Sequence, residues 1–169
     1  MDLNVVLREK REKNLIIKRN FWLLQKNKAL WLIKVSNKAL IKDLRDWLIL
    51  LPVWFVIEID GIETEKLWKN IVVTSKIDDS ELIGFDFIIC DDDLENLNKF
   101  LEIWVTPIVS LSNPLNSILK EFNPVKNEWN SFQFESLDKW SIFYTLVRYL
   151  ENYKFSFDNK NLVKNVLST

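Results

Sequence analysis

The sequence predicts an α/β fold of the Rossmann-like class, in which a parallel sheet carries helices on both faces. Two observations and one general rule lead to this prediction. Short apolar runs typical of buried strands alternate along the chain with segments whose apolar residues recur at helical spacing. Strands that alternate with helices form parallel sheets, because a parallel pair needs a long crossover connection. The length of 169 residues suits one domain, residues 1–169, without a linker or an internal repeat.

Five segments are predicted to be strands, because each is an apolar run bounded by polar or turn residues. They are residues 30–35, 53–59, 71–74, 86–89 and 106–109. Ligands of such sheets bind beyond the carboxyl ends of the strands. Those ends are near Ser36, Asp60-Gly61, Thr74-Ser75, Asp91 to Asp93 and Ser110 to Asn113.

The segments between these strands are predicted to be helices. They are residues 4–20, 39–48, 92–103 and 114–122, a long helix capped by Ser136, and residues 158–167. Pro114 suits the first turn of its helix, where its missing N–H costs nothing. In the helix after Ser136, one face carries Leu137, Trp140, Phe143, Tyr144 and Val147. We therefore expect Trp140 to pack in the core.

The balance of tryptophan and glycine is abnormal, with eight tryptophans and two glycines. Glycine usually makes up about 7% of a protein, so roughly twelve are expected. Trp104 follows the helical run 92–103, at a position that favours a left-handed residue, usually glycine. Trp68 lies between two lysines, and Trp129 lies in the polar loop 126–131.

We interpret several of these tryptophans as positions where the native gene specifies glycine. A lineage that reads the codon UGA as glycine, translated with UGA as tryptophan, would give this exchange. For Trp104 and Trp129, this hypothesis predicts a glycine-like backbone or a largely exposed indole. The alternative is an aromatic-rich core.

Charge and histidine content exclude several classes of function. The net charge of −1 and the pI of about 5.6 argue against nucleic acid or an anionic membrane as a partner. The basic stretch 8–28 is interrupted by Glu9 and Glu12, which favours a solvated helix face. The absence of histidine excludes a Ser-His-Asp or Cys-His nucleophile, a histidine base and an ordinary zinc site.

Cys90 is the one cysteine, so no internal disulfide can form and a reducing compartment fits. It ends an apolar run and is predicted to be a buried small hydrophobe. The first residues have no signal-peptide pattern, and no apolar run approaches the roughly 18 residues of a membrane span. We expect a cytoplasmic protein.

Several segments match, in order and spacing, the motifs of one enzyme family. They are Lys13-Asn14 through Phe21-Trp22-Leu23, Leu30 to Ser36, Phe55 to Gly61, Phe85 to Ile89, Lys99 to Ile108, and Trp129-Asn130-Ser131-Phe132-Gln133-Phe134. With glycine at the suspect tryptophans, residues 10–166 resemble the C-terminal, sugar-nucleotide-binding domain of bacterial glycogen and starch synthases. More broadly, they resemble retaining glycosyltransferases of the GT-B fold, which have two Rossmann-like domains.

The resemblance implies a site that holds the donor diphosphate after the first strand. The family has Ser-Arg-Leu-x-x-Gln-Lys-Gly there, and this chain has Ser36, with Asn37 in place of the arginine and Lys42 at the lysine position. Lys42 is the implied catalytic residue, because phosphoryl oxygens need a fixed cation in the transition state. Asn37 removes a bidentate cation.

Two further motifs of the family are altered. Its two glutamates, eight residues apart beside the donor sugar and ribose, correspond to Asp91 and Lys99. Its glycine pair, which binds sugar and phosphate through backbone N–H groups, corresponds to Asn113-Pro114, flanked by Ser112 and Leu115. Proline has no N–H to offer. Ser36, Asn37, Asp91, Lys99, Ser112, Asn113 and Leu115 are therefore the implied substrate-binding residues.

The resemblance implies a domain that binds a nucleoside-diphosphate sugar of the ADP- or UDP-glucose type, without a cofactor or a metal. It is half of a hexosyltransferase, so a separate N-terminal acceptor domain is an expected partner, and we expect no useful sugar transfer by the isolated chain. One alternative is a degenerate, non-catalytic domain that binds a partner or a glycan. Another is a receiver-like domain that uses Asp91 to Asp93.

Each candidate also has a simple structural interpretation. Asp91 to Asp93 can cap a helix, Lys42 can be a solvated helix residue, and Ser110 to Asn113 can be a plain loop.

Overall fold

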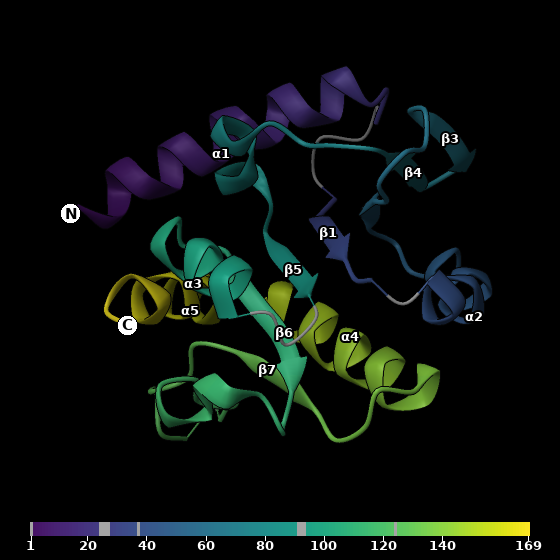
Figure 1. The fold of residues 1–169 in the computed structure, drawn as a ribbon. Helices are drawn as coiled ribbons and strands as arrows, with labels where there is room; N and C mark the ends of the chain where they lie inside the picture. The colour runs from purple at the N-terminus through teal and green to yellow at the C-terminus, as the bar shows by residue number, and fades with distance from the viewer. Residues whose placement is uncertain (1, 24–27, 37, 91–93, 124) are drawn as a thin grey trace. The chain divides into compact units, whose positions relative to one another are not determined.

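The computed structural model describes residues 2–23, 28–36, 38–90, 94–123 and 125–169 (Figure 1). The chain divides into two compact units, Met1–Ile89 and Cys90–Thr169. Both units combine parallel strand pairs with helices, so the predicted α/β, Rossmann-like class is confirmed. The organisation of residues 1–169 as one domain stays a prediction.

The strands of the first unit follow the spatial order β3-β4-β2-β1-β5. They are β1 (Leu30–Lys34), β2 (Trp54–Glu58), β3 (Glu65–Trp68), β4 (Ile71–Thr74) and β5 (Phe87–Cys90). β1 pairs with β2 and β2 with β4 in parallel, whereas β3 is antiparallel to β4. The side chains of β4 and β5 are all buried, which is why each is an unbroken apolar run.

Helix α1 (Leu3–Asn20) is fixed to the 3-10 helix η1 (Asp79–Gly84) by buried polar contacts. Lys10 Nζ donates hydrogen bonds to the carbonyl oxygens of Ile83, at 3.0 Å, and Phe85, at 2.8 Å. Lys10 and Lys18 are both buried. The interpretation of residues 8–28 as a solvated face is therefore wrong at these two lysines, because their amines replace water with protein acceptors.

Gly84 lets α1 approach η1 closely. A Cβ at this position would lie 2.7 Å from the backbone N of Asn14 and from the backbone C of Lys13. Asn14 Nδ2 donates to the Gly84 carbonyl oxygen at 2.8 Å. Glycine is therefore required here for space rather than for its backbone conformation.

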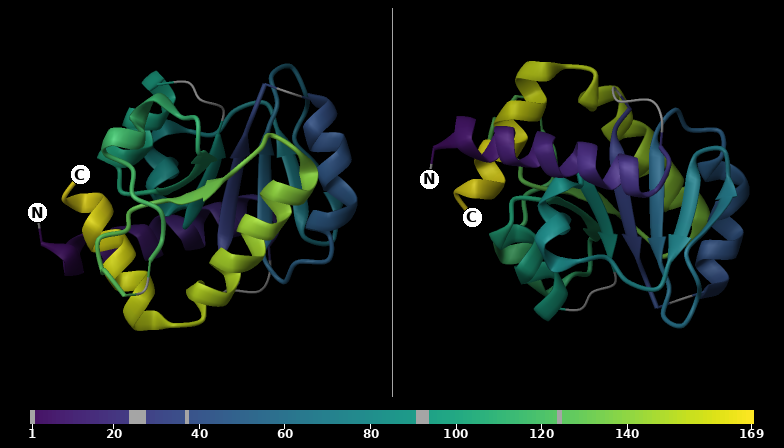
Figure 2. Two further views of the ribbon diagram at one scale, coloured as in Figure 1. Left: turned by 90° about the horizontal axis from the view of Figure 1, so that it is seen from below. Right: turned by 90° about the horizontal axis from the view of Figure 1, so that it is seen from above.

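The second unit places β6 (Thr106–Ser110) beside β7 (Phe132–Phe134) in parallel, with Ile108 opposite Phe132. Its helices are α3 (Leu94–Glu102), α4 (Lys139–Tyr153) and α5 (Ser156–Leu167), together with the 3-10 helix η2 (Pro114–Ser117). α4 packs against β7 and α5 (Figure 2). The segment predicted as a helix at 114–122 is helical only over its first four residues.

Helix α4 buries a different face from the predicted one. The N-cap of the helix is Asp138 rather than Ser136. The Asp138 carboxylate accepts hydrogen bonds from the backbone N–H groups of Trp140 and Ser141 at 2.8 and 3.1 Å. The stripe Ile142, Leu146 and Tyr149 is fully buried. Trp140 is 62% exposed, so its predicted place in the core is wrong.

Two tryptophans have a glycine-like backbone. Trp22 has φ 56° and Trp104 has φ 60°, both in the left-handed region. The prediction for Trp104 is confirmed. The prediction for Trp129 is wrong, because its indole is 2% exposed and its φ is not positive. In that loop the left-handed residue is Asn127, with φ 51°.

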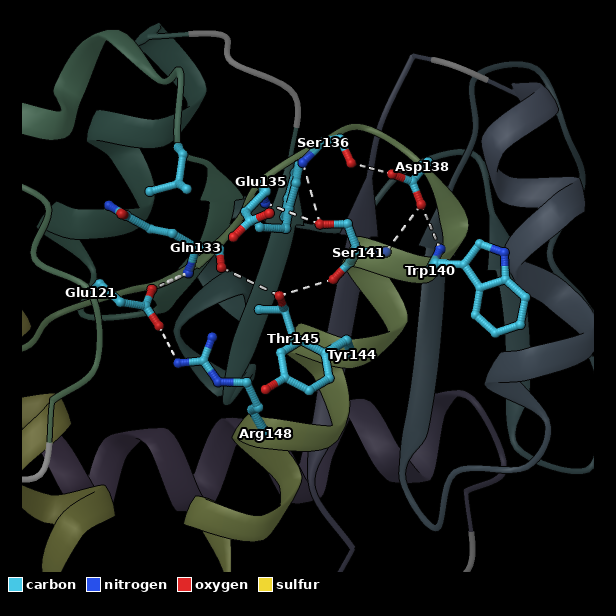
Figure 3. A pocket seen from close by; sticks show the side chains of 12 residues that line it. Glu121, Gln133, Glu135, Ser136, Asp138, Trp140, Ser141, Tyr144, Thr145 and Arg148 are labelled. Carbon is cyan, nitrogen blue, oxygen red and sulfur yellow. Dashed lines mark hydrogen bonds and ion pairs between the residues drawn. The ribbon is translucent and has the colours of Figure 1, made fainter.

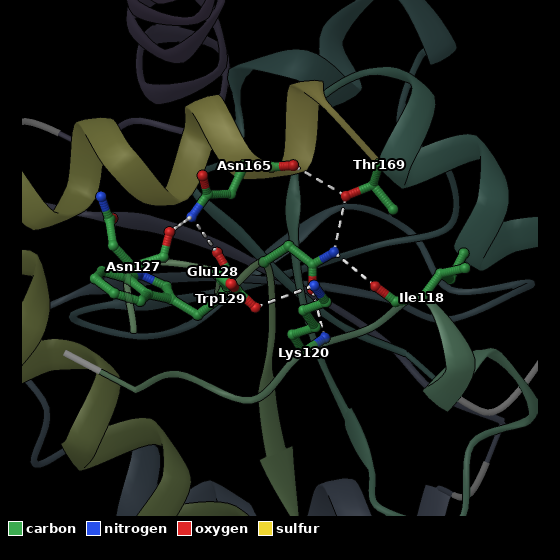
Figure 4. A network of polar contacts seen from close by, with 8 residues as sticks. Ile118, Lys120, Asn127, Glu128, Trp129, Asn165 and Thr169 are labelled. Atoms are coloured by element: carbon green, nitrogen blue, oxygen red, sulfur yellow. Dashed lines mark hydrogen bonds and ion pairs between the residues drawn. The ribbon is translucent and has the colours of Figure 1, made fainter. Parts of the chain in front are cut away.

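A polar network explains how the loop around Trp129 is held (Figure 4). Asn130 accepts from the Lys120 N–H at 2.7 Å and donates to the Thr169 hydroxyl at 2.8 Å. Asn165 Nδ2 donates to the Trp129 carbonyl oxygen at 2.8 Å. The Trp129 indole then packs edge-on against Phe122, with 5.0 Å between ring centroids.

In the described part of the chain, no helix combines the length and the apolar character needed to cross a membrane.

Candidate functional site

Ser36 and Lys42, two residues of the predicted diphosphate site, lie in the first unit. Ser36 follows the carboxyl end of β1 and is exposed. Lys42 lies on the exposed side of α2 (Lys38–Leu48), whose other side buries Leu40 and Leu44. The Lys42 ammonium group is therefore accessible to a ligand. Asn37 lies outside the described residues.

The second predicted pair is placed only in part. Lys99 lies in the last turn of α3 and is half-buried. Its positive charge there suits the carboxyl end of the helix dipole, where the family's glutamate would not. Asp91, with Asp92 and Asp93, lies outside the described residues.

The loop after β6 brings Ser112, Asn113 and Leu115 together. The Ser112 N–H donates to Ser110 Oγ at 3.2 Å, and the Asn113 N–H donates to the Ser110 carbonyl oxygen at 3.0 Å. Asn113 is buried, caps η2, and accepts from the Leu115 N–H at 2.8 Å.

These contacts leave the loop without a backbone cradle for an anion. The Asn116 N–H donates to the Asn113 carbonyl oxygen at 3.1 Å, and Pro114 has no N–H. Every backbone N–H from residue 112 to residue 116 is thus already used. An anion cradle requires such groups to point at the ligand.

A groove of about 500 Å³ opens beside the carboxyl end of β7 (Figure 3). It is lined by β7, by the loop that leads to α4, and by one side of α4. Leu111, just beyond the carboxyl end of β6, also lines it. The groove therefore lies at the strand ends where ligands of parallel sheets bind.

The inner part of the groove is a fixed ion pair. Arg148 Nη2 donates to Glu121 Oε1, and the Gln133 N–H donates to Glu121 Oε2. Burial raises the pKa of Glu121, although the Arg148 guanidinium opposes that rise. The Arg148 guanidinium also lies over the Tyr144 ring, 5.7 Å from its centroid.

The mouth of the groove is aromatic and polar. Trp140 and Tyr144 are spaced four residues apart on α4 and are 62% and 65% exposed. Glu135 and Ser136 line the same groove from the preceding loop. Sequence reasoning missed this groove because it assigned Trp140 and Tyr144 to the buried stripe of the helix. A second stripe of apolar residues at helical spacing, Ile142, Leu146 and Tyr149, was the sequence signal that could have identified the buried face of this helix.

No group of three or more acidic or cysteine side chains that could hold a metal ion occurs among the described residues.

No family model and no curated protein sequence matches the chain. Solved structures match it by fold. The catalytic domain of starch synthase IV from Arabidopsis thaliana, bound to ADP and acarbose, is 16% identical with a TM-score of 0.74. The match covers 95% of this chain and 39% of that chain.

Two spinosyn glycosyltransferases match as well. The spinosyn forosaminyltransferase SpnP is 12% identical over 86% of this chain and 41% of its own, with a TM-score of 0.58. The spinosyn rhamnosyltransferase SpnG, complexed with spinosyn aglycone, is 11% identical over 83% and 42%, with a TM-score of 0.56. The chain spans about two fifths of the length of these structures. It has the fold of the C-terminal half of GT-B glycosyltransferases.

Proposed function

We propose that the chain is the sugar-nucleotide-binding half of a glycosyltransferase of the glycogen and starch synthase type. The supporting observation is the likeness to the catalytic domain of starch synthase IV, which extends over 95% of this chain. The structure of that domain was solved with ADP and acarbose bound. A donor of the ADP- or UDP-glucose type is the matching ligand. The acceptor half of such an enzyme comes from another domain, so the chain by itself binds donor and does not transfer sugar.

Lys42 is the residue that carries donor binding in this proposal. It is exposed on α2, the helix that follows the carboxyl end of β1 in the chain. The resemblance assigns this segment to the donor diphosphate. Ser36, exposed after β1, supplies a hydroxyl in the same proposal, and Asn37 replaces the family's arginine. One lysine attracts a diphosphate as a point charge and cannot fork around it.

The resemblance also assigns the loop at Asn113 to donor binding, and this loop offers few donors. Its backbone N–H groups are consumed by internal hydrogen bonds, so the sugar and phosphate lose the donors that a glycine pair would offer. Donor binding then depends on side-chain cations, and dissolved salt weakens their attraction to the diphosphate. We therefore propose a weak, salt-sensitive donor site.

Calorimetric titration with ADP-glucose and UDP-glucose tests this function. Lys42→Ala should reduce donor affinity by about tenfold, as expected for one lost charge-assisted contact. Lys69→Ala is a matched control, since Lys69 is an exposed lysine of the same unit in the turn between β3 and β4. No donor binding by the parent chain, or equal losses in both variants, would contradict the proposal.

A second candidate, glycan binding without catalysis, is favoured by the groove on α4. Sugar rings pack their C–H faces on exposed aromatic rings and hydrogen-bond to nearby carboxylates and hydroxyls. Trp140 and Tyr144 offer the rings, and Glu135 and Ser136 offer the polar groups.

Titration with a linear glucan oligosaccharide tests this candidate. Trp140→Ala and Tyr144→Ala should each weaken binding at least tenfold. Phe157→Ala, which removes an aromatic ring exposed on α5, should leave binding unchanged. Equal affinities in the three variants would reject the groove as a glycan site.

A further inference from the structure

Helices α1 and α3 end in the same hydrogen-bonded geometry. After α1, the Trp22 N–H donates to the Arg19 carbonyl oxygen at 3.2 Å, and the Leu23 N–H donates to that of Lys18 at 2.7 Å. After α3, the Trp104 N–H donates to the Leu101 carbonyl oxygen and the Val105 N–H to that of Phe100, both at 3.0 Å. This pattern of paired bonds is the Schellman motif.

The Schellman motif explains why the backbone at both tryptophans is left-handed. The residue that follows the C-cap must take positive φ for the two bonds to form, and glycine does so without a steric penalty. Trp22 and Trp104 occupy that position with φ 56° and 60°. A side chain with a Cβ is strained there, and a bulky residue at positive φ is a genuine outlier.

Packing gives no compensating reason for the indole at Trp22. This side chain is 60% exposed, while its neighbour Leu23 is buried, at the position where the motif usually has an apolar residue. At Trp104, the buried residue is likewise the next one, Val105. At both helix ends, the sequence is right for the motif except at the one residue that should be glycine.

We propose that the polypeptide made in the native cell carries glycine at positions 22 and 104. The codon there would be UGA, decoded by a glycine-accepting tRNA, and tryptophan would result only from reading UGA under another code. The composition supports this proposal, because the chain has two glycines in 169 residues where roughly twelve are expected. This inference does not depend on the proposed function.

Trp31 marks the limit of the proposal, because its side chain fills space in the core. Its indole is fully buried, edge-on to Phe55 at 5.4 Å between ring centroids and tilted against Phe87 at 5.8 Å. Glycine at this position in β1 would leave a large cavity in the core. Position 31 should therefore be encoded by UGG.

The decisive experiment identifies the codons and measures peptide masses across positions 22, 31 and 104 in protein from the native cell. The proposal requires UGA with a glycine peptide at 22 and 104, and UGG with a tryptophan peptide at 31. UGG at positions 22 and 104, or tryptophan in those two peptides, would overturn it.

Recombinant variants give an independent test of the backbone argument. Trp22→Gly and Trp104→Gly should each raise Tm by about 2–8 °C, because the left-handed strain is removed. Trp22→Ala and Trp104→Ala are matched controls that remove the indole but keep a Cβ, and they should gain much less. Trp31→Gly should lower Tm strongly. Alanine variants that match the glycine variants, or glycine variants without any gain, would contradict the proposal.

Discussion

Lys10 Nζ donates a hydrogen bond to the carbonyl oxygen of Phe85 at 2.8 Å from inside the first unit. Burial lowers the pKa of Lys10 to about 8, and the nearby Asp86 carboxylate limits the fall. Folding therefore releases protons from this lysine at alkaline pH. Its contribution to stability should increase as the pH rises from about 8 toward 10.5, the ordinary lysine value.

Lys10→Met tests this pH dependence in urea denaturation. Since the variant leaves two buried carbonyl oxygens without a partner, it should lose about 1–3 kcal/mol at neutral pH. Its deficit relative to the parent should widen between pH 8 and 10, because only the parent gains stability there. Lys69→Met, at an exposed position, should show no such change. A deficit that narrows with rising pH would contradict the account.

Gly84→Ala should cost about 1–3 kcal/mol, because its Cβ would clash with the backbone of α1. Gly61→Ala is the matched comparison. At Gly61 there is open space but φ is +77°, so alanine should cost only about 1 kcal/mol from backbone strain. Hydrogen exchange should show α1 loosened in the first variant alone. Equal protection of α1 in both variants would contradict a steric role of Gly84 in the packing of α1.

Arg148→Met should destabilise the second unit in a pH-dependent way. Burial already raises the pKa of Glu121, and loss of the guanidinium raises it further. An acid with a raised folded pKa loses stability as the pH rises from its unfolded value through its folded value. The variant should therefore lose about 1–3 kcal/mol at neutral pH and recover part of it as the pH falls through the raised pKa of Glu121 toward the ordinary value of 4.5. Glu121→Gln with Arg148→Met should remove that pH dependence.

Strand positions follow directly from the sequence where burial is complete. The predicted runs 30–35, 53–59 and 71–74 match β1, β2 and β4 within one residue at each end. β3 was not predicted because all four of its side chains are exposed, so no apolar run marks it. β7 was missed because three residues are too few to show a period.

The candidate site was harder to predict than the fold. Asn113 was assigned to substrate, yet its side chain is buried and caps η2. Such hydrogen bonding within a loop depends on tertiary geometry and leaves no spacing signal. On α4, two apolar stripes compete, and only packing against β7 selects the one at Ile142 and Leu146. Trp104 was predictable because the rule for helix ends is local.

The central claim, an inherited donor site, is tested most directly by restoring the family's charges. Asn37→Arg combined with Lys99→Glu is titrated calorimetrically with ADP-glucose and UDP-glucose beside the parent chain and Lys42→Ala. An inherited donor site should bind the donor tenfold or more tightly in the double variant, since a bidentate cation returns to the diphosphate. Lys42→Ala should lose donor affinity. A double variant that binds no tighter than the parent, together with an unchanged Lys42→Ala, would contradict the claim.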